Sequence, residues 1–107
     1  MDKLQVLVLI VPDTLKDDVV DALIGLPAVS GFTLSDAAGY SSEHSHFNLR
    51  EQVEGYRNFC RLEVLHEPAV FEPLCASLHQ ACGGQAVRYW LSPVLRQGHL
   101  GGDAEDH

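Results

Sequence analysis

The sequence predicts a single α+β domain in which the elements follow the order strand, helix, strand, strand, helix, strand. Three observations predict this order: an apolar run near the N-terminus, two segments with apolar residues at helical spacing, and short alternating segments after each of them. The chain has 107 residues, of which 46% are hydrophobic and 21% are charged. This length and composition suit one globular domain.

The first half of the chain predicts one strand, one helix and a second strand. The strand is Leu4–Val11, which is apolar on both side-chain parities and therefore expected to be covered on both faces. Asp13 and Thr14 offer N-cap oxygens to the helix that follows. The apolar residues of that helix are Leu15, Val19, Ala22, Leu23 and Leu26. Gly25 and Pro27 are expected to end it, and the second strand is predicted at residues 29–36.

The second half predicts the remaining strands and a second helix. The third strand is Phe59–Leu65, where Cys60, Leu62 and Val64 alternate with Arg61 and Glu63. The helix starts between Pro68 and Val70. Its apolar residues are Phe71, Leu74, Cys75, Leu78 and Cys82. Gly83 and Gly84 are expected to cap it, and the last strand is predicted at residues 86–91, with a stop near a proline.

This order favours a ferredoxin-like βαββαβ sandwich, a four-stranded antiparallel sheet with both helices on one face. The other face of the sheet is then bare. It is expected to carry apolar residues of the first strand together with Phe59, Leu65 and either Trp90 or Tyr89. Because an apolar sheet face in water is an association surface, the sequence predicts an oligomer.

Charge, cysteine content and motifs narrow the function. The net charge is −8, from 15 acidic and 7 basic residues with no basic cluster, which argues against nucleic-acid binding. The N-terminal apolar run is too short to span a bilayer. Three cysteines without a C-x-x-C pair argue against a disulfide framework and favour a reducing cytoplasm. The motifs of common catalytic sites are absent from the sequence, so we expect a protein that is not an enzyme.

The connection between the second and third strands is much longer than a hairpin requires. It covers residues 37–58, where two to five residues would suffice, and long connections are often functional. His44 and His46 are two positions apart, so in an extended segment both imidazoles face one side, and Glu43 adds a carboxylate. We expect a divalent transition-metal ion as the ligand, with a third donor from His66, Cys60 or a second subunit; solvated histidines without a metal are the alternative.

Several segments together resemble the PII signalling superfamily. They are the strand LVLIVP before an acidic helix, VSGFT at the second strand, GYSS at the start of the long connection, FCRLEVL, the glycine pair and RYWLSPVL. The resemblance covers about residues 3–100. It is strongest to a PII-like branch of uncharacterised proteins often encoded beside heavy-metal efflux pumps of the RND type.

The resemblance implies a cytoplasmic homotrimer with a regulatory or sensing role. It also implies a protein target, which we expect to be a membrane transporter. The resemblance implies that residues 37–58 correspond to the T-loop, within a PII-like domain over residues 1–100. Residues 101–107 are polar, acidic and led by glycines, and we expect them to form a flexible tail. PII proteins bind nucleotides between subunits. The positions that match this cleft are Gly39, Gly83, Gly84, Arg88 and Arg96. Gln85 stands where PII proteins carry a lysine after the glycines.

Three hypotheses follow. The first is a trimeric PII-like regulator linked to heavy-metal efflux or homeostasis, whose long connection binds a metal ion or small ligand. The second is a signal transducer that binds a nucleotide or another anion in the cleft between subunits. The third is a small enzyme or redox protein that uses Cys60.

Overall fold

The computed structural model describes residues 3–39 and 57–102, and within them the predicted order of elements is confirmed. Two short 3₁₀ turns, Asp13–Leu15 and Pro68–Val70, lead into the helices. The strands and helices are β1 (Leu4–Pro12), α1 (Lys16–Ile24), β2 (Phe32–Gly39), β3 (Arg57–His66), α3 (Phe71–Cys82) and β4 (Arg88–Val94).

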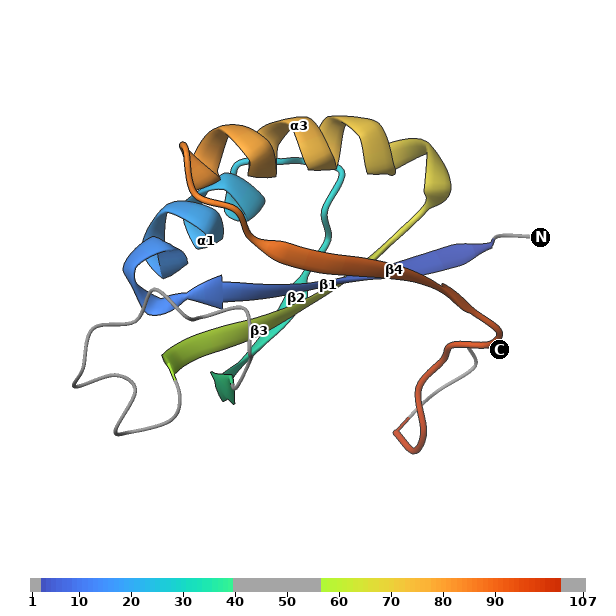
Figure 1. Cartoon of the computed structure of the whole chain (residues 1–107). Coiled ribbons are helices and arrows are strands. Elements are labelled where there is room, and N and C mark those ends of the chain that lie inside the picture. The colour runs from blue at the N-terminus through green and yellow to red at the C-terminus, as the bar shows by residue number, and fades with distance from the viewer. Residues whose placement is uncertain (1–2, 40–56, 103–107) are drawn as a thin grey trace.

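The four strands form one antiparallel sheet in the order β2-β3-β1-β4. Both helices lie on the same face of this sheet (Figure 1). This is the α+β, ferredoxin-like arrangement that the sequence predicts. β1 and β3 are central, and β2 and β4 are the two edges.

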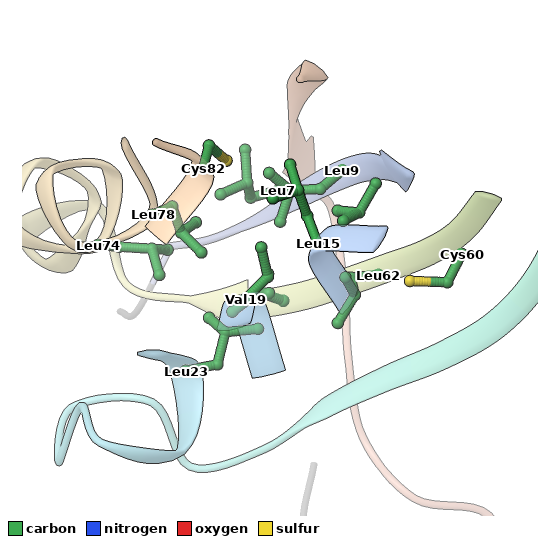
Figure 2. Close-up of a cluster of buried hydrophobic side chains, with 12 residues drawn as sticks. Leu7, Leu9, Leu15, Val19, Leu23, Cys60, Leu62, Leu74, Leu78 and Cys82 are labelled. Atoms are coloured by element: carbon green, nitrogen blue, oxygen red, sulfur yellow. The ribbon is translucent and has the colours of Figure 1, made fainter. Parts of the chain in front are cut away.

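The core lies between the sheet and the two helices (Figure 2). Alternate residues of β1 and β3 point into it and meet one stripe from each helix, because side chains alternate along a strand and recur every three or four residues along a helix. The buried cluster consists of Leu7, Leu9, Val11, Leu15, Val19, Leu23, Cys60, Leu62, Val64, Leu74, Leu78 and Cys82. The apolar stripes expected for both helices are therefore confirmed at most positions. Cys75, which was expected in the core, is only partly buried.

Strand boundaries differ from the sequence prediction at three places. β2 starts at Phe32, because residues 29–31 connect it to α1, and it continues to Gly39. β3 begins at Arg57, so the residues between these two strands are 40–56. β4 begins at Arg88 and passes through Pro93. A proline is tolerated there because β4 is an edge strand with one unpaired side.

Of the two helix caps that the sequence predicts, the one at the C-terminal end of α3 is confirmed and the one at the N-terminal end of α1 is absent. Gly83 follows α3 with φ of 64°, a conformation that favours glycine, so this glycine ends the helix as expected. Asp13 and Thr14 make no side-chain capping bond to α1. Asp13 and Thr14 instead lie within the 3₁₀ turn that precedes α1, and Leu15 is at the N-cap position of that helix.

Candidate functional site

The predicted metal ligands Glu43, His44 and His46 lie outside the described residues. In the described part of the chain, no group of three His, Cys, Asp or Glu side chains could hold a metal ion. His66 was considered as a third ligand. It is at the C-terminal end of β3, nine residues or about 30 Å from the strand's first residue, where the connection ends.

Four of the five predicted cleft residues lie at one end of the sheet. Gly39 ends β2, Arg88 starts β4, and Gly83 and Gly84 lie in the turn between α3 and β4; these element ends gather on one side in Figure 1. Arg96 follows the other end of β4, which is about 20 Å long. One subunit therefore does not bring the five residues together.

Gly39 has a structural role of its own. A Cβ atom at this position would lie 2.4 Å from Cε2 of Phe59, which is in the neighbouring strand. The aromatic ring thus covers the glycine, an arrangement that stabilises glycines in sheets. Among the described residues, Gly83 and Gly84 have no such neighbour within 4 Å. Close packing against Phe59 is thus sufficient to explain Gly39 without a ligand.

The most distinctive surface is the sheet face away from the helices, which we call the open face. Its apolar centre runs across the three strands β3, β1 and β4, and its members are Val6, Val8, Ile10, Phe59, Leu65 and Trp90. Val8 is only 3% exposed although no helix covers it, because its cross-strand neighbours Glu63 and Trp90 flank it. The open face is therefore largely apolar, as predicted.

One polar cluster lies within the open face. Nε of Arg61 donates to Oε2 of Glu63 at 2.9 Å. The same guanidinium lies 5.6 Å from the centroid of the Trp90 ring, within the range of a cation–π contact. Arg61 thus contacts both Glu63 and Trp90 within the single subunit. Of the two aromatic residues expected here, Trp90 is on the open face, and Tyr89 points to the helix side.

The opposite end of the sheet holds a polar pair that the sequence analysis missed, the buried His66 and the partly buried Gln5. His66 is buried, and its Nδ1 lies 2.9 Å from the carbonyl oxygen of Glu67, so Nδ1 carries the proton and donates it. Within the described residues, Nε2 of His66 and Oε1 of Gln5 are buried without a hydrogen-bond partner. The two residues are cross-strand neighbours. Gln5, a glutamine inside an apolar strand, was the signal for this pair.

A cavity of about 670 Å³ adjoins His66. Glu67, Ser30 and Gln97 also line it, together with apolar residues of β1 and β3. Nε2 of His66, which has no hydrogen-bond partner within the described residues, lies beside this cavity, so a group that donates a hydrogen bond would suit it. Phe71 stacks on the imidazole at a centroid distance of 6.0 Å and holds the ring in place.

The three cysteines are all thiols of raised pKa. Burial raises the pKa of Cys60, and the nearby carboxylate of Asp13 adds to the shift. Burial also raises the pKa of Cys75, with a further contribution from Glu72, and that of Cys82. Since the thiolate is the reactive form, these environments oppose a nucleophilic or redox role for Cys60.

The raised thiol pKa values predict a pH dependence of stability. A thiol with a higher pKa in the folded state than in the unfolded state binds more protons when folded, so the free energy of unfolding falls as pH rises. The contribution of the protonated thiols to the free energy of unfolding is complete below the ordinary cysteine pKa of about 9.0, and it is lost as the pH rises above that value. Urea titrations between pH 7 and 10.5 should show this fall. A variant with all three cysteines replaced by alanine should show a smaller fall, and an equal fall would contradict the assignment.

No helix in the described residues is long and apolar enough to cross a membrane.

Comparison with solved structures identifies the fold. CPII, a nitrogen regulatory PII-like protein from Thiomonas intermedia bound to ADP, AMP and bicarbonate, matches with 15% identity and a TM-score of 0.65 over 86% of this chain and 90% of that chain. Arabidopsis thaliana PII bound to citrate matches with 18% identity and a TM-score of 0.66 over 100% of this chain and 94% of that chain. At these identities the similarity shows the fold, which is PII-like.

A nearer relative and a family match complete the comparison. A crystal structure of a DUF3240 family protein from Shewanella baltica matches with 38% identity and a TM-score of 0.77, over 94% of this chain and 100% of that chain. No curated protein matches. Residues 1–101 match the family described as "Protein of unknown function (DUF3240)". With this match across nearly its whole length, the chain belongs to the DUF3240 family, whose fold is that of the PII proteins.

Proposed function

We propose that this protein is a cytoplasmic, PII-type regulator that forms a homotrimer and catalyses no reaction. In this proposal, the open face is buried between subunits and residues 40–56 are the element that receives a ligand and contacts a target. The single observation that carries the proposal is the open face itself. The PII-like fold supports it independently.

The size of the open face follows from the dimensions of the sheet. Four strands at a spacing of about 4.8 Å and a length of about 27 Å give a projected area of about 500 Å². The accessible area is larger because side chains protrude, and specific interfaces bury about 800 Å² per partner. Trp90 and Leu65 are the large apolar side chains of this face that one subunit leaves half exposed. Their burial by neighbouring subunits would stabilise a trimer.

We further propose that Glu43, His44 and His46 bind a transition-metal ion and that this event is relayed to a partner, for which the resemblance suggests a heavy-metal efflux transporter. The spacing of two imidazoles and a carboxylate supports the proposal. In the described residues no alternative metal cluster competes with this site. A donor from a second subunit would complete the coordination, because His66 lies at the far end of β3 and Cys60 is fully buried in the core.

Calorimetric titration of the trimer tests the metal site. Zn²⁺, Cu²⁺, Ni²⁺ and Co²⁺ are offered in turn to the wild type and to the double variant His44→Ala/His46→Ala. We expect micromolar binding of at least one ion to the wild type and a loss of at least 100-fold in affinity in the double variant, because a site with one remaining donor is too weak. His79→Ala, which removes an exposed histidine of α3, is the matched control and should bind as the wild type does.

Two results would remove the metal proposal. One is the absence of heat for all four ions at concentrations up to about 100 µM, well above micromolar affinity. The other is unchanged affinity in His44→Ala/His46→Ala. Neither result bears on the trimer, which sedimentation measures separately.

A second candidate function is binding of a nucleotide or another anion between subunits. The observation that favours it is the distribution of the predicted residues, since Gly39, Gly83, Gly84 and Arg88 lie at one end of the sheet and Arg96 lies at the other. Only two subunits could supply both ends to one ligand. The ligands in the structures of CPII (ADP, AMP and bicarbonate) and of the Arabidopsis PII (citrate) are all anions, which supports this candidate.

Thermal-shift measurements discriminate this candidate from the first. ATP, ADP, AMP, cyclic nucleotides, citrate and bicarbonate are tested at millimolar concentration, at which a ligand with a Kd of about 10 µM stabilises by about 2.7 kcal/mol. The cleft proposal expects a rise in Tm that Arg96→Ala and Arg88→Ala each reduce. The absence of any shift with these ligands would count against it.

A further inference from the structure

The segment that follows β4 is exposed to an unusual degree. We call residues 95–102 the C-terminal arm. Leu95 and Leu100 are fully exposed, and they are the two most exposed large apolar side chains in the described part of the chain. In Figure 1 the arm leaves β4 below the sheet, on the side away from both helices. Burial of these two leucine side chains against another apolar surface would be favourable.

The helix side of the same edge strand carries an apolar groove. The groove has a volume of about 660 Å³ and lies between α3 and β4, and its apolar wall includes Leu7, Leu9, Cys75, Cys82 and Tyr89. Tyr89 and its neighbour Leu91 are partly exposed because the two helices leave β4 uncovered. The groove thus offers carbon-lined space at the edge of the sheet.

We propose that the C-terminal arm of one subunit lies in the α3–β4 groove of a second copy of this chain. The dimensions agree, since Leu95 and Leu100 would be about 17 Å apart in an extended chain, and Glu72 and Cys82, the first and last α3 residues that line the groove, are about 15 Å apart along the helix. The charges agree as well, because Arg96 follows the first leucine and Glu72 is exposed at one end of the groove.

A second copy is favoured over the arm's own groove by the topology. The arm leaves on the open-face side of the sheet, whereas the groove is on the helix side. Both adjoin β4, so two subunits that meet at this edge bring an arm and a groove together. Such a contact joins the arm of one subunit to the groove of the next. Because the two surfaces differ, three identical contacts of this kind can close a ring of three subunits. The inference therefore rests on the proposed trimer and adds a second contact to it.

Disulfide trapping tests the arm contact with the protein's own cysteines. Leu100→Cys is oxidised with diamide, and non-reducing gels and peptide mass spectrometry identify the products. We expect a disulfide between position 100 of one chain and Cys75 or Cys82 of another, with at least tenfold more linked chains than Ile24→Cys gives. Ile24 is the matched control, an exposed aliphatic residue on α1 outside the groove. Adding Cys75→Ala and Cys82→Ala should abolish the product.

Two outcomes would overturn the inference. One is a trimer in which Leu100→Cys links no more than Ile24→Cys does. The other is a disulfide within one chain, which would mean that the arm folds onto its own subunit. Failure of the trimer itself is seen separately, as a monomeric wild type in sedimentation.

In the double variant Leu95→Ser/Leu100→Ser the concentration at which the trimer dissociates should rise about 100-fold, whereas Gln97→Ser should leave this concentration unchanged.

Discussion

Replacement of Leu23 by alanine is expected to destabilise the domain by about 3 kcal/mol. Leu23 is fully buried in α1, where it contacts the cluster between the helices and the sheet (Figure 2). Its truncation removes apolar contacts and leaves a cavity that the surrounding side chains fill only in part. Because a domain of this size is stable by about 5–15 kcal/mol, the change removes a large share of its stability.

Urea denaturation followed by circular dichroism measures this effect. The matched control is Ile24→Ala, which removes a similar side chain at the next position of the same helix, where it is 70% exposed. The control should lose less than about 1 kcal/mol, since an exposed side chain gains little on folding. Equal losses in the two variants would mean that α1 does not present Leu23 to the core.

The substitution Leu65→Glu is expected to convert the trimer to monomers. Leu65 lies on the open face, 39% exposed in the single subunit and paired across the sheet with Val6. A carboxylate there remains hydrated in a monomer. In the trimer it would be buried on the same face of β3 as Glu63, and a buried charge without a partner costs about 3–5 kcal/mol. The dissociation concentration should therefore rise at least 100-fold.

Sedimentation velocity measures the oligomeric state of the variant, and circular dichroism shows whether it is folded. The matched control is Ile24→Glu, the same chemical change on the helix side of the molecule. It should remain trimeric, and both variants should keep the circular dichroism spectrum of the wild type. A trimeric Leu65→Glu protein would show that the open face is not the interface.

Much of the fold could be predicted from the sequence because the periodic signals agree with one another. The apolar run of β1 extends over both side-chain parities, and the structure uses both, with Leu7 and Leu9 toward the helices and Val8 on the open face. The stripes of α1 and α3 follow the helical period and are buried as expected. These signals are local, so neighbouring residues suffice to detect them.

The features that could not be predicted depend on long-range pairing. Pro93 was read as a stop for the last strand, but it is accommodated because β4 is an edge, which only the sheet order reveals. The choice between Tyr89 and Trp90 for the open face depends on register with β1. Cys75 fits the helical stripe, but it is only partly buried because α3 does not cover β4.

The sequence named candidate residues for a cleft between subunits, but it did not show which of them lie together. The resemblance to PII proteins singled out Gly39, Gly83 and Arg88 as cleft positions, and the structure places these three residues at one end of the sheet. Arg96 is remote within one subunit, which a linear sequence could not show. The polar pair of Gln5 and His66 was missed because its members are far apart in the chain and meet only through the register of β1 and β3.

Sedimentation equilibrium of the wild-type protein at micromolar concentration tests whether apolar side chains on the helix-free side of the sheet hold the subunits together. We predict a single species with three times the mass of the chain, stable to dilution into the nanomolar range. A folded monomer that persists at the highest concentrations would contradict this account.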